Sequence, residues 1–258
     1  MKIACCIWAL SLPETELLRQ VRELGFNWID VQPGHLRTLE SRLLAQELGM
    51  RVSCVGASFG LPAGASLDSV DSAAREAAVD HVRKTIAFAA DIGADTIYVV
   101  PGKDASAEAL ERYAESLSRL ADAASERAIK IAIEHFPGTA LPTAADTLEF
   151  IFGTRHRNLY LLIDTGHLQI SCEEPEQTII NAGDRLAYVH FDDNDGIGDL
   201  HWALLDGVMT EESLATTIAA LDGIGYQGAL SLELNPKLPK VKRALQSSRD
   251  ILMRACLL

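Results

Sequence analysis

The stretch AADIGADTIYVV, residues 89–100, contains the pattern that decides the fold. An apolar helical segment ends at Ile92, Gly93 follows, and a run rich in β-branched residues begins soon after. Glycine directly after a helix is typical of the C′ position, where the backbone adopts the left-handed conformation. The same junction recurs before three other β-rich runs, at Gly25, Gly49 and Gly225. This repetition predicts alternating helices and strands.

Short apolar runs of this kind occur eight times, near residues 2–8, 28–32, 51–57, 96–100, 130–134, 159–163, 186–191 and 229–233. They are almost continuously hydrophobic, as expected for parallel strands that are buried on both faces. Each is followed by a loop and an amphipathic segment, and strict alternation predicts a parallel α/β sheet. Eight such units in 258 residues favour a closed (β/α)8 TIM barrel, forming a single domain over residues 1–258.

The main alternative to a barrel is a doubly wound open sheet, which would carry a glycine-rich phosphate loop after its first strand. Residues 3–13 read IACCIWALSLP and contain no such loop. Two local signals add detail to the barrel. Ser11 to Glu14 match a capping box, which predicts the start of the first helix. The third unit carries extra loop from Ser58 to about Asp71, which we expect to fold over the barrel mouth.

The charge balance argues against nucleic acid as a partner. The chain has 23 Lys and Arg against 36 Asp and Glu, a net charge of −13, which repels a phosphate backbone unless a local basic stripe is present. The longest basic cluster, Lys237 to Arg243, holds only four cations. No apolar stretch approaches the roughly 18 residues that span a bilayer, so we expect no membrane partner.

The cysteines and the first residues indicate the cellular compartment in which the protein resides. The five cysteines are scattered and form no CxxC motif, a pattern typical of buried thiols in a reducing compartment. The first ten residues carry one lysine and no convincing cleavage site follows, so we interpret them as the first strand rather than a signal peptide. We therefore expect a cytoplasmic protein.

Polar side chains follow the last four predicted strands, at the end of the barrel where active sites lie. These strands end in IAIEH, LLIDTGH, YVHFDDND and LSLELNP, which place four ligand-type side chains at one mouth: Glu134, Asp164, His190 and Glu233. Ionised carboxylates at the ends of buried strands are costly unless compensated, and three together repel one another. A divalent cation relieves both problems. The set predicts one ion and does not choose among Mn²⁺, Zn²⁺, Mg²⁺, Fe²⁺ and Co²⁺.

Other residues near this mouth carry weaker signals. His167, three residues after Asp164, is predicted to face substrate rather than to bind that ion. His135 is either a site residue or packed beneath the site. Turn chemistry explains the aspartate run at residues 192–195. The earlier units would shape specificity through four residues, Trp8, His35, Phe59 and Lys103.

Four motifs together resemble the xylose-isomerase-like barrel superfamily: IEH, IDTGH, VHFDDNDGIGDLH and GYQGALSLELN. That group includes sugar-phosphate isomerase/epimerase-type proteins, keto-sugar 3-epimerases, inosose isomerases and dehydratases, hydroxypyruvate isomerases and an apurinic endonuclease branch. The eight-unit plan extends the resemblance over the whole chain, and the specific motifs fall within residues 131–236.

The resemblance implies roles for individual residues. Glu134, Asp164, His190 and Glu233 fall on the family's metal ligands, and the two glutamates also fall on its acid/base pair. His167 matches a histidine that faces substrate in the sugar enzymes. A D-x-H motif, here Asp199 and His201, completes a further zinc site with that histidine in the nuclease branch, so a second ion is allowed. The implied activity is a metal-dependent isomerase or epimerase of a small sugar, keto-sugar or polyol, phosphorylated or not, acting by proton transfer through an enediolate.

At two places the sequence departs from the family pattern, and this narrows the range of activities that we expect. The nuclease branch takes two further histidines from the ends of strands three and four, which here read CVGASFG and YVVPGK, so an endonuclease is not expected. Keto-sugar epimerases carry an arginine a few residues after the strand-seven histidine, whereas FDDNDGIGD has none. This puts a free keto-sugar epimerase in doubt and leaves isomerase and inositol-type substrates open.

Two other functions remain as alternatives. One is a dehydratase of an inosose or a dehydroshikimate-like substrate, and the other is a non-catalytic barrel that binds sugar or metal. The intact acid/base pair counts against the second. The apolar C-terminus ILMRACLL, residues 251–258, would serve either a homodimer interface or the packing of the last helix, and we expect packing.

Overall fold

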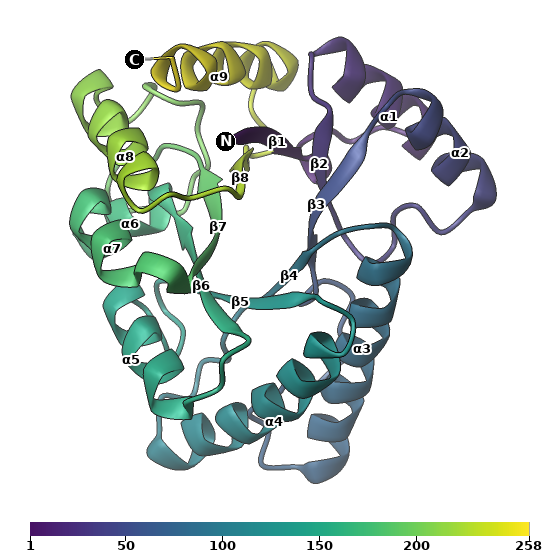
Figure 1. Ribbon diagram of the computed structural model, residues 1–258, viewed down its shortest axis with the longest axis vertical. Helices are drawn as coiled ribbons and strands as arrows, with labels where there is room; N and C mark the ends of the chain where they lie inside the picture. The colour runs from purple at the N-terminus through teal and green to yellow at the C-terminus, as the bar shows by residue number, and fades with distance from the viewer. Residues whose placement is uncertain (258) are drawn as a thin grey trace.

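The computed structural model describes residues 1–257, and within them eight parallel strands close into a barrel in sequence order (Figure 1). The strands are β1 (Lys2–Cys6), β2 (Trp28–Val31), β3 (Arg51–Gly56), β4 (Thr96–Val99), β5 (Lys130–Glu134), β6 (Leu159–Asp164), β7 (Leu186–Phe191) and β8 (Ala229–Leu232). Each coincides with one of the predicted runs, and β1 pairs with β8 to complete the closure. The predicted (β/α)8 TIM barrel is confirmed.

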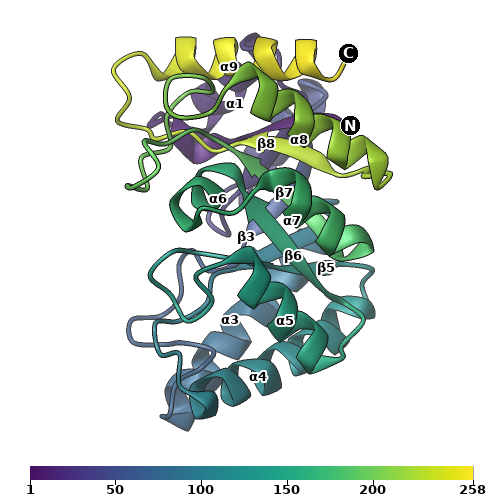
Figure 2. The same cartoon turned by 90° about the vertical axis from the view of Figure 1, so that its left-hand side faces the viewer.

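Helices surround the barrel and cover its outer face (Figures 1 and 2). They are α1 (Glu14–Glu23), α2 (Leu39–Glu47), α3 (Ser72–Asp91), α4 (Ala107–Ser125), α5 (Ala144–Thr154), α6 (Thr165–Ser171), α7 (Pro175–Ala182), α8 (Glu211–Gly223) and α9 (Val241–Ala255). Short 3-10 turns, η1 (Ile7–Ala9) and η2 (Gly183–Arg185), follow β1 and precede β7. No helix in this described part is both long and apolar enough to cross a membrane.

The predicted glycine junctions have the expected backbone conformation. Gly25, Gly49, Gly93 and Gly225 have φ values of +91°, +66°, +76° and +70°. Each therefore reverses the chain at the end of a helix without the steric cost that a side chain would impose.

The predicted capping box at Ser11 is wrong. The residue before α1 is Pro13, and no side chain caps this helix. The Glu14 carboxylate instead accepts a hydrogen bond of 2.6 Å from the backbone N–H of Leu36, in the loop after β2. Glu14 therefore makes a hydrogen bond to a distant loop instead of the local one that a capping box requires.

The last helix packs against the barrel, as expected for the apolar C-terminus. Leu245 and Leu252 of α9 are fully buried, and the helix lies beside β1 and β8 (Figure 1). Leu257 is 84% exposed, and Leu258 lies outside the described residues.

The two-residue period of the strands explains what fills the barrel. A small interior cluster, distinct from the main core between strands and helices, contains Ala132 of β5, Leu162 of β6 and Tyr188 of β7. Because side chains alternate between the faces of a strand, residues two positions further on also point inward. Those residues are Glu134, Asp164 and His190. The barrel interior therefore opens onto polar side chains at the C-terminal ends of its strands.

Candidate active site

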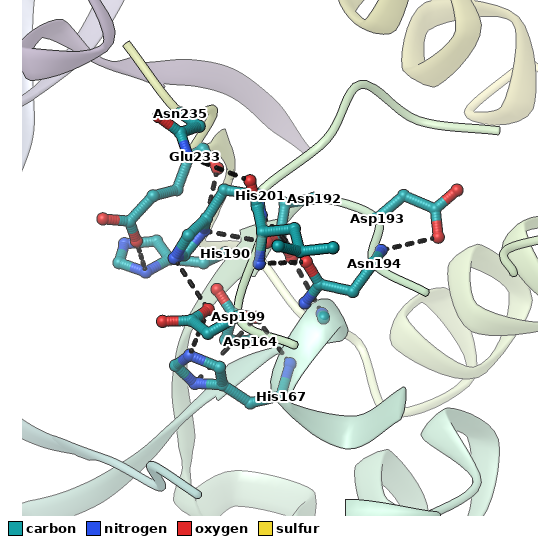
Figure 3. Close-up of polar contacts among 12 residues, drawn as sticks. Asp164, His167, His190, Asp192, Asp193, Asn194, Asp199, His201, Glu233 and Asn235 are labelled. Carbon is teal, nitrogen blue, oxygen red and sulfur yellow. Dashed lines mark hydrogen bonds and ion pairs between the residues drawn. The ribbon is translucent and has the colours of Figure 1, made fainter. Parts of the chain in front are cut away.

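The four side chains predicted to share a site lie together at the C-terminal mouth, and Figure 3 shows three of them, Asp164, His190 and Glu233. Glu134, Asp164, His190 and Glu233 come from the ends of β5 to β8, and each offers a ligand atom within 4.8 Å of the others. We call these four residues the quartet. His190 lies at its centre, with Nδ1 at 2.7 Å from Oε2 of Glu233 and 3.2 Å from Oε1 of Glu134.

The quartet meets the requirements of a divalent cation site. It supplies three carboxylates and one imidazole, a donor set that several divalent metals accept. Oδ1 of Asp164 accepts a hydrogen bond of 2.9 Å from the backbone N–H of His167, which places Asp164 as the N-cap of α6. Its Oδ2 is buried and has no hydrogen-bond partner among the described residues. A buried carboxylate oxygen without a partner is costly, and a bound cation would satisfy it.

The pKa values of the two glutamates of the quartet are shifted in opposite directions. Burial raises the pKa of Glu134 above its ordinary value, despite hydrogen bonding to His190. For Glu233 burial acts in the same direction, but the charge and hydrogen bond of His190 together with the charge of His201 outweigh it, and the pKa is lowered. For His190 itself, burial opposes protonation, yet the charge of Glu233 raises its pKa well above the usual range.

A second polar cluster adjoins the quartet and consists of His167, Asp192, Asp199 and His201 (Figure 3). His201 Nε2 lies 2.9 Å from Oδ1 of Asp199 and its Nδ1 lies 2.8 Å from Oδ2 of Asp192. The same Asp199 oxygen lies 3.4 Å from Nε2 of His167. The structure thus brings together the three residues predicted for a second ion or for substrate, and it adds Asp192.

The acidic and basic groups of this second cluster shift one another's pKa values. Burial disfavours a charged His167, but the adjacent charge of Asp164 and the contact with Asp199 raise its pKa to about 10. Burial raises the pKa of Asp192 to about 7. Asp199 is more exposed and, although burial opposes it, hydrogen bonds from the two histidines lower its pKa.

The close approach of two loops explains the glycine in IDTGH. A Cβ on Gly166 would lie 2.2 Å from Nδ2 of Asn194 and 2.5 Å from Oδ1 of Asp192. Real Cβ atoms are not found that close, so only glycine permits the start of α6 to pack on the segment after β7. The backbone N–H of Gly166 also donates a hydrogen bond of 2.8 Å to Asp192.

The interpretation of the aspartate run as turn chemistry holds for one residue only. Asp195 is exposed and accepts hydrogen bonds from the backbone of Ile197 and Gly198, as in a turn. Asp192 and Asp193 are fully buried, so the interpretation is wrong for them. Asp193 holds the loop after β7, because its carboxylate accepts bonds from four donors: Gln169 Nε2 and the backbone N–H groups of Asn194, Gly207 and Met209.

His135, for which two interpretations were open, is packed beneath the site. It is fully buried, and its Nε2 accepts a bond of 3.4 Å from the backbone N–H of Asp164. Burial lowers its pKa to about 3, so the ring is neutral at physiological pH.

A cavity of about 230 Å³ opens beside the quartet. Both glutamates border it, and its lining is Ser58, Phe59, Tyr98, Val100, Glu134, Phe136, His167, His201 and Glu233. Ser58 and Phe59 begin the extra loop of the third unit, so this loop reaches the mouth as expected. None of these lining residues is a lysine or an arginine.

The four residues predicted to shape specificity are not equally placed. Phe59 lines the cavity, and the ring of Trp8 packs on it with a centroid separation of 5.2 Å. His35 is held in its own loop, where Nδ1 accepts a bond of 3.1 Å from the backbone N–H of Gln32. Lys103 is exposed on the loop after β4. Neither His35 nor Lys103 lines the cavity.

Sequence reasoning did not identify Asp30, Tyr98 or Phe136. Tyr98 and Phe136 line the cavity, and Asp30 lies fully buried in the barrel interior. Only Asp30 had a usable signal in the sequence, because a carboxylate inside the apolar run WIDV is unusual for a buried strand. Tyr98 is an aromatic residue in a core strand and Phe136 lies in the loop after β5, and neither carries such a signal.

Comparison with known proteins identifies similar chains. The model of a family described as "Xylose isomerase-like TIM barrel" matches residues 18–252. The L-ribulose 3-epimerase of Mesorhizobium japonicum is 27% identical over 245 residues, covering 88% of this chain and 78% of that protein. An inosose dehydratase of Lacticaseibacillus casei is 37% identical over 83 residues, 32% of this chain and 28% of that protein.

Among solved structures, one of an L-ribulose 3-epimerase superposes with a TM-score of 0.84 at 22% identity. The match covers 100% of this chain and 95% of that one. At this level of identity the superposition supports the fold.

Proposed function

The chain belongs to the xylose isomerase-like TIM barrel family, and from this premise we propose that it is a divalent-metal-dependent epimerase or isomerase of a small sugar. The observation that carries the proposal is that Glu134 and Glu233 border one cavity while sharing the quartet with Asp164 and His190. The similarity of most of the chain to an L-ribulose 3-epimerase supports a ketose substrate. It outweighs the doubt raised by the missing arginine after His190.

The quartet would hold the cation, which would polarise the carbonyl of a hydroxy-ketone and acidify the adjacent C–H. One glutamate would remove the proton from that carbon as general base, giving an enediolate. The other glutamate would return a proton. Return to the opposite face of the same carbon gives epimerisation, and return to the neighbouring carbon gives isomerisation. His167, at the cavity wall, would donate to a substrate oxygen.

The cavity favours an unphosphorylated monosaccharide. Its volume of about 230 Å³ is below the ~300–1,000 Å³ of most drug-sized pockets. Phe59, Tyr98 and Phe136 provide apolar walls for the C–H faces of a sugar. The lining offers no lysine or arginine, the side chains that usually hold a phosphate. Lys103 is therefore not part of our proposal.

The second cluster would bind substrate or a second ion. His167, Asp199 and His201 offer ligand atoms within 4.8 Å of one another. Asp199 lies 3.4 Å from His167 and 2.9 Å from His201, and this pairing of opposite charges favours a substrate role. A stoichiometry of two metals per chain would instead favour the second ion.

A dehydratase acting on an inosose is the second candidate. The local similarity to an inosose dehydratase at 37% identity favours it, as does the absence of an arginine after His190. The same first proton abstraction would then be followed by loss of a β-hydroxyl. This reaction would produce a new conjugated absorbance that an epimerase does not produce.

The experiment that tests the proposal combines metal analysis with proton exchange. Protein purified without chelator or nickel is assayed for metal by mass spectrometry and then incubated with a panel of ketoses and an inosose in deuterium oxide. We expect about one divalent ion per chain and deuterium in recovered ketose and product. Glu134→Gln and Glu233→Gln should each lower the exchange rate by about 10²–10⁴-fold.

Glu47→Gln is the matched control, because Glu47 is exposed on α2 and the charge change is the same. It should exchange as the parent does. Loss of water without deuterium in the recovered ketose would favour the dehydratase. Binding of neither metal nor ketose would overturn the proposal.

A further inference from the structure

A cluster of polar side chains fills the barrel interior directly beneath the quartet, on the side away from the cavity. Asp30 of β2 is its centre and is fully buried. Cys6 of β1, Ser53 of β3 and Tyr188 of β7 surround it. Burying a carboxylate in such surroundings costs free energy unless it is hydrogen-bonded, so the presence of Asp30 here needs a structural reason.

The two oxygens of Asp30 have different partners. Oδ1 accepts hydrogen bonds of 2.6 Å from Ser53 and 2.5 Å from the hydroxyl of Tyr188. Oδ2 accepts from the thiol of Cys6 at 3.6 Å and faces Nε2 of His190 at the same distance. One oxygen is therefore anchored by two hydroxyls, and the other points at the ring of His190.

The strand register builds this arrangement. Pairing between β2 and β3 shifts at Ile29 and Asp30, so that Asp30 pairs with Cys54 and Ser53 is left as the extra residue. Such a bulge re-aims a side chain, and here both Ser53 and Cys54 face the interior.

The ring of His190 is fixed between two sets of carboxylates. Nδ1 faces Glu134 and Glu233, whereas Nε2 faces Asp30. The rings of Tyr98 and Tyr188 pack edge-on against it, with centroid separations of 5.2 and 5.7 Å. A ring flip would exchange the two nitrogens, and this packing opposes it.

We propose that Asp30 is a positioning residue that keeps a proton on Nε2 of His190, so that the Nδ1 lone pair is available to a metal in the quartet. This inference rests on the proposed function. A neutral imidazole carries one proton, and the partner of one ring nitrogen decides which nitrogen can bind metal. With a metal on Nδ1, the nearest carboxylate oxygen to Nε2 is Oδ2 of Asp30, at 3.6 Å, and this oxygen is the acceptor that faces an Nε2–H.

Asp30→Asn tests this inference because the structure dictates how the amide would lie. Ser53 and Tyr188 would hold the amide oxygen at the Oδ1 position, which places the amide NH₂ opposite Nε2. An NH₂ group only donates, so Nε2 would have to accept and the ring proton would move to Nδ1. Nδ1 would then be blocked for the metal.

The measurement compares the parent, Asp30→Asn and Ser53→Ala, each made metal-free and shown to be folded by circular dichroism. Ser53→Ala is the matched control, because it removes a hydrogen bond to Asp30 and leaves the group facing Nε2 unchanged. We expect Asp30→Asn to weaken Mn²⁺ and Zn²⁺ binding, measured against a chromophoric chelator, by about 10–100-fold. Ser53→Ala should weaken it far less.

Nitrogen-15 NMR of the ring of His190 in the Zn²⁺-loaded parent and Ser53→Ala gives the second readout. Zinc on Nδ1 displaces the proton from that nitrogen, so Nε2 should carry the single ring proton in both proteins. An unprotonated Nε2 in the zinc-loaded parent would overturn the inference even if Asp30→Asn did not fold. Metal affinity in Asp30→Asn equal to that of the parent or of Ser53→Ala would also overturn it. A parent that binds no metal refutes the metal site and with it the proposed function, whereas a parent that binds metal no better than Asp30→Asn refutes the role of Asp30 alone.

Discussion

The indole Nε1 of Trp8 donates a hydrogen bond of 3.0 Å to Oε1 of Glu233, which joins the end of the first barrel unit to the end of the last strand. The other oxygen of Glu233 lies 2.7 Å from Nδ1 of His190. Both oxygens of Glu233, one of the proposed acid/base pair, therefore have fixed partners. Trp8, predicted to shape specificity, thus also orients a carboxylate.

Trp8→Phe should slow the reaction without unfolding the barrel. The substitution keeps an aromatic ring against Phe59 and removes the donor to Glu233. A hydrogen bond to a charged group contributes ~1.5–3 kcal/mol, so we expect kcat to fall by about 10–100-fold. Steady-state kinetics on the ketose that exchanges deuterium measures this. Trp28→Phe, at the opposite end of the barrel beside Lys2, is the control and should retain kcat; equal losses in the two variants would contradict the role of Trp8.

In the metal-free protein, Asp199→Asn should make the stability less sensitive to alkaline pH, because the contact with Asp199 helps to raise the pKa of His167. The pKa of His167 is raised to about 10, above its ordinary value of 6.5. The stabilisation due to its charged form is therefore complete below about pH 6.5 and is lost as the pH rises through 10. Without the charge of Asp199 the folded-state pKa falls and less is lost. We expect the free energy of unfolding in urea to drop between pH 6 and pH 11 by about 1 kcal/mol less in the variant than in the parent. Identical drops would contradict it.

Asp193→Ala and Asp195→Ala should differ sharply in stability, although the two residues are neighbours in the same motif. Asp193 is fully buried, and its removal leaves four donors without their acceptor. We expect its free energy of unfolding to fall by about 3 kcal/mol or more. Asp195 is exposed, and its loss should cost about 1 kcal/mol or less. Chemical denaturation of both variants tests this, and similar values would show that Asp193 does not hold the loop.

Thiol labelling should separate the cysteines by burial. Cys172 is exposed and Cys256 is partly buried, whereas Cys5, Cys6 and Cys54 are buried. Burial raises the pKa of each of these three thiols, so little reactive thiolate is present. A chromogenic disulfide reagent should modify Cys172 fastest and Cys256 more slowly, with the rest reacting only in denaturant. A third thiol that reacts rapidly in the folded protein would contradict the packing around β1 and β3.

The sequence by itself determined the barrel and the membership of the quartet. Glycine at the helix ends and apolar runs of strand length are local features, and they depend on residues that are near one another in the chain. Parallel closure then brings the ends of β5 to β8 together, so Glu134 and Glu233 could be assigned to one mouth before their distance was known. Their conformity to a family pattern strengthened that assignment.

The tertiary structure alone decided what surrounds the quartet. Asp30 meets His190 because closure of the barrel and the shifted register of β3 turn it toward β7, and no local pattern encodes that register. Asp192 and Asp195 are three residues apart in one polar motif, yet one is buried beside His201 and the other caps an exposed turn. The difference arises because α6 packs on the segment after β7 and buries Asp192. Burial decides how much free energy a charged side chain costs, and it depends on how the whole molecule packs.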